Sequence, residues 1–375
     1  MLTLTAPTHD EPQASPTDTA PPDRAPGGGR DPRALLHYLA PIAPYLADPR
    51  ITEIAINRPG ELWTEESTGW QRHAASALTL ECCRFLASLV ATYDHKHVDE
   101  RTPTLSATLP AGERIEIVLP PACEPGTVSF TIRKPAQIRR TLDQHETEGA
   151  FDAIVDIARA DRTLNPLEDE LLALKAARRW REFLALAVRS RRNIVLSGAT
   201  GSGKTTLLKS LLDCIPATER LVTIEDVAEI TLPRQPNHVH LYYSKDGQGS
   251  ARVTAKQLLA ASLRMKPTRI LLAELRADEA FMFLDAANTG HPGSMTTVHA
   301  NSAKLAFARI ASLIGQAPEA ANRRFADILA EVQAKIDIVI QCEEVANAHE
   351  GRSTTTRRIT EIYYAPLAQR RLAAE

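Results

Sequence analysis

The chain has 375 residues, of which 43% are hydrophobic and 24% charged, an ordinary composition for a globular protein with a sizeable core. Its length predicts two domains. Its formal net charge of -2 excludes a global basic field for nucleic acid, and we therefore predict no sequence-specific nucleic-acid binding.

The five cysteines form no CxxC pair and have no metal-ligand spacing, which indicates a reducing compartment rather than a disulfide framework. No apolar run approaches the ~20 residues that a membrane-spanning helix needs. The first residues lack a basic region followed by an apolar stretch, so they do not resemble a signal peptide. We expect a cytoplasmic protein, and peripheral contact with a membrane fits the same observations.

Residues 1–33 are rich in Pro, Ala, Asp and Thr and hold almost no large apolar side chain after Leu4. Such a segment cannot bury enough surface to offset its ordering entropy. We therefore predict a disordered tail, either idle or able to bind a partner.

Residues 34–137 mix helical and alternating patterns, which predicts a smaller α+β N-terminal domain. Turn residues such as Pro110-Ala-Gly112 separate short β-like runs, as hairpin loops would. The expected helices are 34–45 and 80–93, and the expected strands are 51–57, a strand beginning at Glu61, 106–109, 114–119 and 128–132.

Residues 138–180 are charged and poor in aromatic side chains, which predicts a long helical linker. Strands then alternate with helices through residues 181–375. This alternation is typical of an α/β fold with a mostly parallel, doubly wound sheet. The expected strands are 193–197, 221–224, 239–243, 270–273 and 294–297, and the expected helices are 183–189, 204–214, 254–264 and 278–288.

A glycine-rich loop joins the first of these strands to the helix that follows. Its sequence, Gly198-Ala-Thr-Gly-Ser-Gly-Lys204-Thr205, matches the GxxxxGK[ST] pattern of phosphate-binding loops. Lys204 would reach the β- and γ-phosphates of ATP, and the Thr205 hydroxyl would ligate Mg²⁺. A chance glycine-rich turn would lack the flanking strand and helix. We predict that ATP is bound by Gly198, Ala199, Thr200, Gly201, Ser202, Gly203, Lys204, Thr205 and Thr206.

Two glutamates follow later apolar strands, where a parallel sheet gathers its ligands. Glu225, followed by Asp226, ends the run Leu221–Ile224, and Glu274 ends the run 270–273. One carboxylate would complete the Mg²⁺ shell, which we assign to Glu274 acting through water, and the other would orient the attacking water. Each glutamate alone could equally be a helix cap or a solvated acid, and the pattern leaves open which one is the base.

Two histidines flank the strand near residue 295. A neutral imidazole at His291 or His299 could hydrogen-bond a γ-phosphate or polarise the water. Most histidines do no chemistry, and we interpret His238 and His240 as structural.

With these motifs in order, the chain resembles the traffic ATPases of type IV secretion and conjugative transfer, within the wider group that includes type II secretion and pilus motors. The resemblance covers residues 34–365. Four blocks carry it, namely the phosphate loop, Ile224-Glu-Asp-Val-Ala-Glu229, Leu263–Arg276 and Thr289–Asn301.

The resemblance implies a RecA-like ATPase domain in a homohexamer, with Mg²⁺ and ATP as cofactors. It also implies that N-terminal arginines touch the nucleotide, with Arg133 at the γ-phosphate and Arg114 assisting. By similarity, Glu274 takes the Walker B position, Glu225 lies in the acidic box, Arg276 follows the strand-end glutamate, and His291 and His299 form the histidine box.

The implied function is an ATP-hydrolysing motor for conjugative DNA or effector protein transfer and for assembly of the apparatus. It would sit on the cytoplasmic face of the bacterial inner membrane, with other secretion ATPases and inner-membrane components as partners. The alternatives are an ATP-gated scaffold with little turnover, a pilus or type II secretion motor, and a DNA helicase or recombinase. The balanced charge disfavours the last of these.

Some features depart from the family pattern. Ala273 and Ala277 replace glycines that the family often has, and a four-cysteine zinc module is absent, which favours the type IV branch. The long segment 138–180 suggests a further hypothesis, in which the ATPase domain sits on a neighbouring subunit's N-terminal domain.

Overall fold

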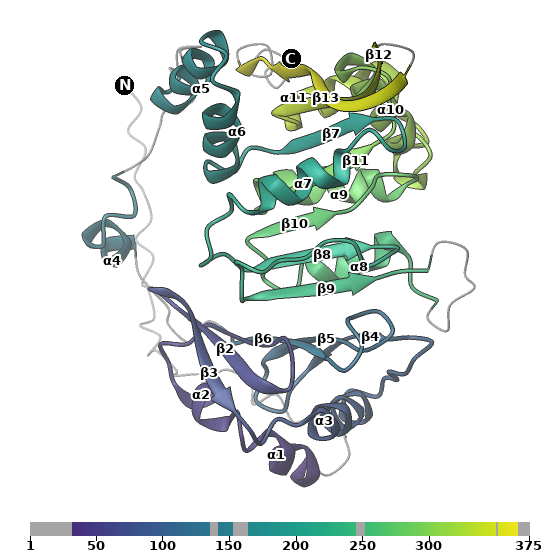
Figure 1. Cartoon of the computed structure of the whole chain (residues 1–375). Helices are drawn as coiled ribbons and strands as arrows, with labels where there is room; N and C mark the ends of the chain where they lie inside the picture. The colour runs from purple at the N-terminus through teal and green to yellow at the C-terminus, as the bar shows by residue number, and fades with distance from the viewer. Residues whose placement is uncertain (1–31, 136–141, 153–163, 245–251, 350–351, 367–375) are drawn as a thin grey trace, which may run out of the picture.

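The computed structural model describes residues 32–135, 142–152, 164–244, 252–349 and 352–366. It contains two sheets, which lie one above the other in Figure 1, with the N-terminal part below and the larger C-terminal part above. The predicted tail, residues 1–33, lies outside the described residues except for its last two positions.

The N-terminal part is built on an antiparallel sheet in the order β3-β2-β1-β6-β5-β4. Helix α3 (Leu80–Tyr93) packs against it and begins where the Thr79 side chain accepts a hydrogen bond from the Cys82 N–H. The α+β prediction is confirmed, although β3 was not foreseen because its residues are polar and half-exposed. The other elements are α1 (Arg33–Leu39), α2 (Ala43–Ala47), β1 (Glu53–Ile56), β2 (Gly60–Glu66), β3 (Gly69–Ala75), β4 (Thr104–Thr108), β5 (Arg114–Val118) and β6 (Ser129–Arg133).

The C-terminal part is built on a sheet in the order β13-β12-β7-β11-β10-β8-β9, parallel except for the edge strand β13. This arrangement confirms the predicted RecA-like, doubly wound α/β domain. The antiparallel hairpin of β12 and β13 at one edge was not foreseen. The strands are β7 (Ile194–Gly198), β8 (Leu221–Glu225), β9 (His238–Tyr242), β10 (Arg269–Leu272), β11 (Met295–Val298), β12 (Ile338–His349) and β13 (Arg352–Tyr364).

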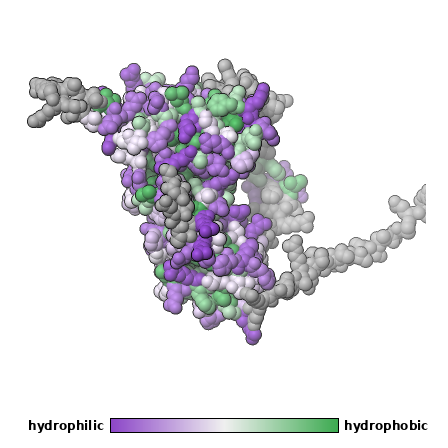
Figure 2. All heavy atoms as spheres, turned by 90° about the vertical axis from the view of Figure 1, so that its right-hand side faces the viewer, coloured by the Kyte–Doolittle hydropathy of each residue, from purple (hydrophilic) through white to green (hydrophobic). Residues whose placement is uncertain are grey.

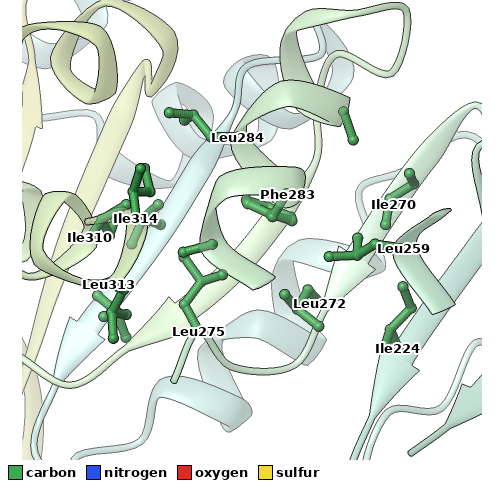
Figure 3. Packing of buried hydrophobic residues seen from close by; sticks show 14 of the residues in the cluster. Ile224, Leu259, Ile270, Leu272, Leu275, Phe283, Leu284, Ile310, Leu313 and Ile314 are labelled. Carbon is green, nitrogen blue, oxygen red and sulfur yellow. The ribbon is translucent and has the colours of Figure 1, made fainter. Parts of the chain in front are cut away.

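Helices cover both faces of this sheet. Phe283, Ile310 and their neighbours converge on β10 from one side in Figure 3, and a second cluster packs Phe183 and Leu208 on the other side. Each fully buried apolar side chain of this size contributes about 1.5–3 kcal/mol, so the two clusters fix the sheet that carries the loops. The helices are α6 (Trp180–Arg189) and α7 (Lys204–Leu212) on one face, and α8 (Ala255–Ser262), α9 (Glu279–Asn288), α10 (Ala303–Ile314) and α11 (Phe325–Lys335) on the other.

The segment 138–180, for which we predicted a long helical linker, contains two short helices among its described residues. Its described residues form α4 (Leu142–Thr147) and α5 (Pro166–Ala176), while 138–141 and 153–163 lie outside the described residues. Helix α5 starts with a capping box at Asn165 and buries Leu171 and Leu174 against the C-terminal sheet. Charge and helical propensity alone could not show that this helix packs on the ATPase domain.

One fully buried arginine joins the two domains. Arg220, just before β8, donates from Nη1 to Asn57 Oδ1 of the N-terminal domain at 2.7 Å and from Nη2 to Thr131 Oγ1 at 3.2 Å. Its guanidinium also lies over the Trp70 ring, 5.2 Å from the centroid. Burial lowers the pKa of Arg220 to about 10, which still leaves it charged at neutral pH.

The edge strand β9 makes a second contact between the domains, on the side that does not pair with β8. The Tyr242 N–H donates to the Ala122 carbonyl at 2.9 Å, and Cys123 forms an antiparallel bridge with Leu241. Within one chain, the β9 edge of the ATPase domain therefore packs on the N-terminal domain. The hypothesis that the ATPase domain also sits on a neighbouring subunit's N-terminal domain stays a prediction.

The outer surface shows no long apolar face in the view of Figure 2, where hydrophilic side chains dominate and hydrophobic ones gather in small groups. Among the described residues, no helix combines the length and the apolar character needed to cross a bilayer.

Replacing Arg220 with Ala should lower the free energy of unfolding by about 3 kcal/mol, because it leaves the buried oxygens of Asn57 and Thr131 without their donor. Calorimetry with denaturant titration measures the loss. The control is Arg50→Ala, whose side chain is 74% exposed and whose surface ion pair with Asp48 contributes little to stability. Equal losses in the two variants would contradict the role of the buried arginine.

Candidate nucleotide site

The sheet order explains how distant segments reach one site. Strands β7, β11, β10 and β8 are consecutive neighbours and parallel, so the residues that follow them meet at one edge. There they surround a cavity of about 350 Å³. Its lining residues are Thr200, Gly201, Lys204, Thr205, Leu208, Asp226, Val227, Glu229, Ile230, Ala273, Glu274, Arg276, Thr297 and His299.

The phosphate loop starts at a position that only glycine can occupy. Gly198 ends β7 with φ +149°, and a Cβ there would lie 2.2 Å from the Cys342 carbonyl oxygen of β12. Gly203, at φ +91°, precedes α7 and gives that helix no side-chain cap, which leaves its first N–H groups free for a ligand. Such a helix start attracts anions.

Lys204 is buried at the floor of the loop. Its Nζ donates to the carbonyls of Gly198 and Ala199, each at 2.8 Å, and burial lowers its pKa. Among the predicted loop residues, Thr200, Gly201 and Thr205 also line the cavity, Ser202 is buried, and Thr206 is exposed on α7.

Glu274 faces the cavity, as predicted, and is held by an arginine and a histidine. Its Oε2 accepts from Arg276 Nη2 at 2.8 Å, and its Oε1 lies 3.1 Å from His299 Nε2. Arg276 also pairs with Asp226, and the hydrogen bond that Arg276 donates to Glu274 raises the pKa of Arg276. The arginine thus bridges the two acids that follow β8 and β10.

His299 links the acid to the loop. Its Nδ1 lies 3.1 Å from the Gly198 carbonyl while its Nε2 faces Glu274. Both neighbours are acceptors, so only the doubly protonated ring can donate to both. The side chain could therefore report a change at the loop to the acid at the end of β10.

Glu225 does not face the cavity. It is fully buried, and its Oε2 accepts the N–H groups of Glu229 and Ile230 at 2.9 and 2.8 Å. The geometry is that of a carboxylate that shapes the loop after β8. Asp226 and Glu229 line the cavity instead. The available signal for them was their place in the acidic segment that begins at the strand-end Glu225.

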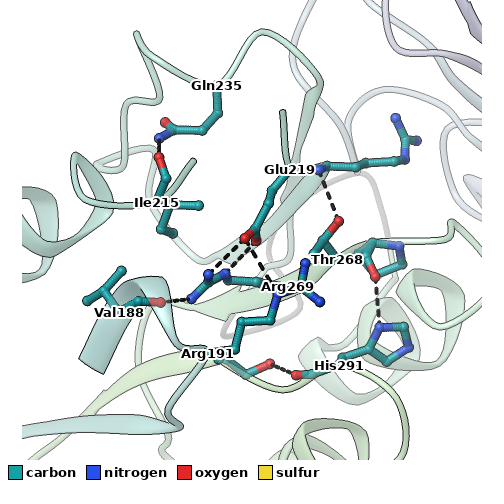
Figure 4. A network of polar contacts seen from close by, with 12 residues as sticks. Val188, Arg191, Ile215, Glu219, Gln235, Thr268, Arg269 and His291 are labelled. Atoms are coloured by element: carbon teal, nitrogen blue, oxygen red, sulfur yellow. Dashed lines mark hydrogen bonds and ion pairs between the residues drawn. The ribbon is translucent and has the colours of Figure 1, made fainter. Parts of the chain in front are cut away.

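His291 lies at the opposite end of the sheet from the cavity. Because it precedes β11 while His299 follows it, the strand separates the two rings. Its Nδ1 donates to the Pro267 carbonyl at 2.8 Å, beside the buried Arg269–Glu219 pair in Figure 4, and burial lowers its pKa. The structure therefore does not bring His291 to the predicted chemistry, because the length of the strand sets the two histidines apart.

Arg114 and Arg133 lie in a second cavity of about 270 Å³, away from the phosphate loop of the same chain. They are cross-strand partners on β5 and β6, and Arg133 Nε donates to Glu53 at 2.5 Å. Like charges directly opposite repel, so this pair is suited to an anion. Within one chain, the structure does not bring these arginines to the nucleotide site.

A buried carboxyl lies in the same second cavity. Glu116 is 4% exposed and accepts a hydrogen bond from Ser106, and burial raises its pKa to about 7 despite Arg264 and Lys96. Its charge therefore depends on pH within the physiological range.

Comparison with known proteins decides the family. Residues 36–360 match the family described as "Type II/IV secretion system protein". The chain belongs to this family. The secretion ATPase is 44% identical over 340 residues to the type IV secretion system protein VirB11 of Brucella suis, covering 90% of this chain and 92% of that one. It is also 44% identical over 336 residues to PtlH of Bordetella pertussis, covering 87% and 94% of the two chains.

Its structure is similar to the crystal structure of the VirB11 ATPase from the Brucella suis type IV secretion system. The TM-score is 0.83 at 43% identity, over 92% of this chain and 98% of that one. The secretion ATPase is thus a motor ATPase of the type IV branch. The expected family, its ATP binding and its α/β architecture are confirmed.

The Glu116 carboxyl gives a pH prediction. Its folded pKa lies above the ordinary value of 4.5, so the stability that its protonated form contributes is complete below pH 4.5 and is lost as pH rises through about 7. The shift corresponds to roughly 3 kcal/mol at most. Glu116→Gln should therefore flatten the change in melting temperature between pH 5 and pH 8, whereas the exposed Glu100→Gln should leave the wild-type slope. An unchanged slope in Glu116→Gln would contradict this.

Proposed function

We propose that the protein hydrolyses Mg²⁺-ATP at the edge of the β7-β11-β10-β8 sheet and uses the cycle to drive type IV secretion. The observation that carries the proposal is that the phosphate loop, Glu274 and His299 line one cavity. The backbone N–H groups of the loop and the Lys204 ammonium would hold the phosphates. These polar groups would take the place of the water molecules that surround the phosphate charges in solution.

Glu274 is the better candidate for the base that orients the attacking water. It faces the cavity, whereas the carboxylate oxygens of Glu225 accept hydrogen bonds from backbone N–H groups and from the Thr223 hydroxyl. Arg276 and His299 keep Glu274 in place, and Arg276 holds Asp226 at the same time.

The cavity also fits a magnesium ion. Thr205, Asp226 and Glu274 line the same cavity, and hard oxygen donors such as hydroxyl and carboxylate groups are the ligands that Mg²⁺ prefers. Thr205, with Glu274 acting through water, would hold the ion, which supplies neutralisation of phosphate charge. The chain's own residues then position the water and the phosphates.

The paired Arg114 and Arg133 would complete the site of a neighbouring subunit. They face away from the nucleotide cavity of their own chain, and the buried Arg220 network holds them there. In a homohexamer, each such pair would reach the γ-phosphate bound by the next subunit, so that hydrolysis loosens the contact between subunits.

We further propose that the ring sits on the cytoplasmic face of the inner membrane. Other secretion ATPases and inner-membrane components would be its partners, and DNA or effector proteins its cargo. The type IV branch of the relatives supports this placement.

Two substitutions test hydrolysis. Lys204→Ala should abolish ATP binding, because it removes the buried ammonium that neutralises the phosphates. Glu274→Gln should keep ATP binding but lower kcat by about 100-fold, the usual loss when a general base is removed. Glu225→Gln provides the matched carboxyl control. Wild-type turnover in Glu274→Gln would favour the scaffold with little turnover, and a larger loss in Glu225→Gln would move the base to that residue.

The ring can be tested by mixing inactive subunits. With ATP, native mass spectrometry should show a particle of six chains, and Arg133→Ala and Lys204→Ala should each lack turnover alone. Equimolar mixing should restore roughly a quarter of the activity, because a heterologous ring then contains interfaces with both intact residues. A stable monomer, or no recovery on mixing, would contradict arginines acting between subunits.

A further inference from the structure

The C-terminal hairpin touches the phosphate loop from outside the cavity. Strand β12 pairs with β7 as far as Cys342 opposite Gly198, and it then continues with β13 beyond the end of β7. The phosphate loop leaves β7 at this point, so the hairpin lies beside it. No sequence motif connects these two segments, which are about 150 residues apart.

Arg357 of β13 makes the contact. Its Nε donates to the Gly201 carbonyl at 3.0 Å, and its methylene stem lies over Gly203, where an added Cβ would be 3.0 Å from the arginine Cδ. The positive φ of Gly203 and this contact both require glycine there. Glu344 lies opposite Arg357 in the strand register, yet the hydrogen bond of the arginine goes to the loop.

The contact of Arg357 with Gly201 affects the nucleotide cavity through one peptide group. Gly201 lines the cavity, and its carbonyl is fixed by Arg357, while the Ser202 N–H of the same peptide donates to the Ala199 carbonyl at 3.3 Å. A peptide held at both ends keeps its plane. The orientation of this plane decides whether the loop presents N–H groups or a carbonyl oxygen to a phosphate.

We propose that Arg357 is a positioning residue of the nucleotide site, which orients the Gly201–Ser202 peptide for phosphate binding and couples the β12–β13 hairpin to nucleotide occupancy. The proposal rests on the nucleotide site proposed above. The Nε of Arg357 is suited to this role because a planar guanidinium donates along a fixed direction while the methylene stem of the arginine packs on Gly203. Lysine has the charge and a stem but no donor at that position.

The test measures binding of the non-hydrolysable analogue AMP-PNP with Mg²⁺ by calorimetry. Arg357→Ala should weaken binding about five- to tenfold, the loss expected for a charge-assisted hydrogen bond that is partly exposed. The value of KM for ATP should rise by a similar factor while kcat changes little. Arg357→Lys should recover only part of the affinity. The matched control is Arg358→Ala, the adjacent exposed arginine, which should bind as the wild type does.

A second readout needs no nucleotide. Hydrogen exchange of the amides at 199–206 should be faster in Arg357→Ala than in Arg358→Ala, because the loop loses its outer contact. Wild-type affinity and exchange in Arg357→Ala, or equal losses in both variants, would overturn the proposal. Lys204→Ala separates the two ideas. If the wild type binds AMP-PNP no better than Lys204→Ala does, the nucleotide site itself is wrong, while hydrogen exchange still tests Arg357.

Discussion

The buried charge of Arg220 fixes the relation between the two domains, and the rest of the molecule is arranged around it. The Arg220 guanidinium is buried away from water. It donates hydrogen bonds to neutral oxygens and lies over one aromatic ring; its partners are Asn57, Asn237, Thr131, the Met265 carbonyl and the Trp70 ring. Separating the domains would take Asn57, Thr131 and Trp70 away from the guanidinium and break the contacts that it makes across the interface. The N-terminal sheet and the ATPase domain of one chain should therefore move as a single body.

This constraint changes how the ATPase cycle is understood. A motion in which the two domains of one chain close on ATP would have to break the Arg220 contacts. Arg114 and Arg133 instead lie in a separate cavity, where the repulsion between the two paired guanidinium groups favours an anion. In the homohexamer proposed above, movement between subunits would leave these buried contacts intact, and nucleotide-dependent change would take place at the contact between subunits.

Inside the ATPase domain, the chemistry depends on side chains from different strands that lie close together at one edge of the sheet. Lys204 holds the loop from below through the carbonyls of Gly198 and Ala199, and Arg357 holds it from outside through Gly201. His299 bridges the Gly198 carbonyl to Glu274. A phosphate that displaces Lys204 from the loop carbonyls would therefore be sensed at both the acid and the hairpin.

The sequence by itself determined the parts that depend on local pattern. Alternation of apolar strands with helices predicts the parallel sheet, and the spacing of Gly198, Lys204 and Thr205 predicts the phosphate loop, because both follow from backbone geometry over a few residues. The strand-end position of Glu274 and the place of His299 after β11 follow from the same rule.

Only the tertiary structure decided what depends on contacts between distant segments. Glu225 and Glu274 both follow strands, but burial turns the first toward backbone N–H groups and leaves the second in the cavity. His291 and His299 look like one box in sequence, yet a strand separates them. Helix α5, the partners of Arg220 and the reach of Arg357 to Gly201 depend on packing across the fold, which no local pattern records because the contacting residues lie far apart along the chain.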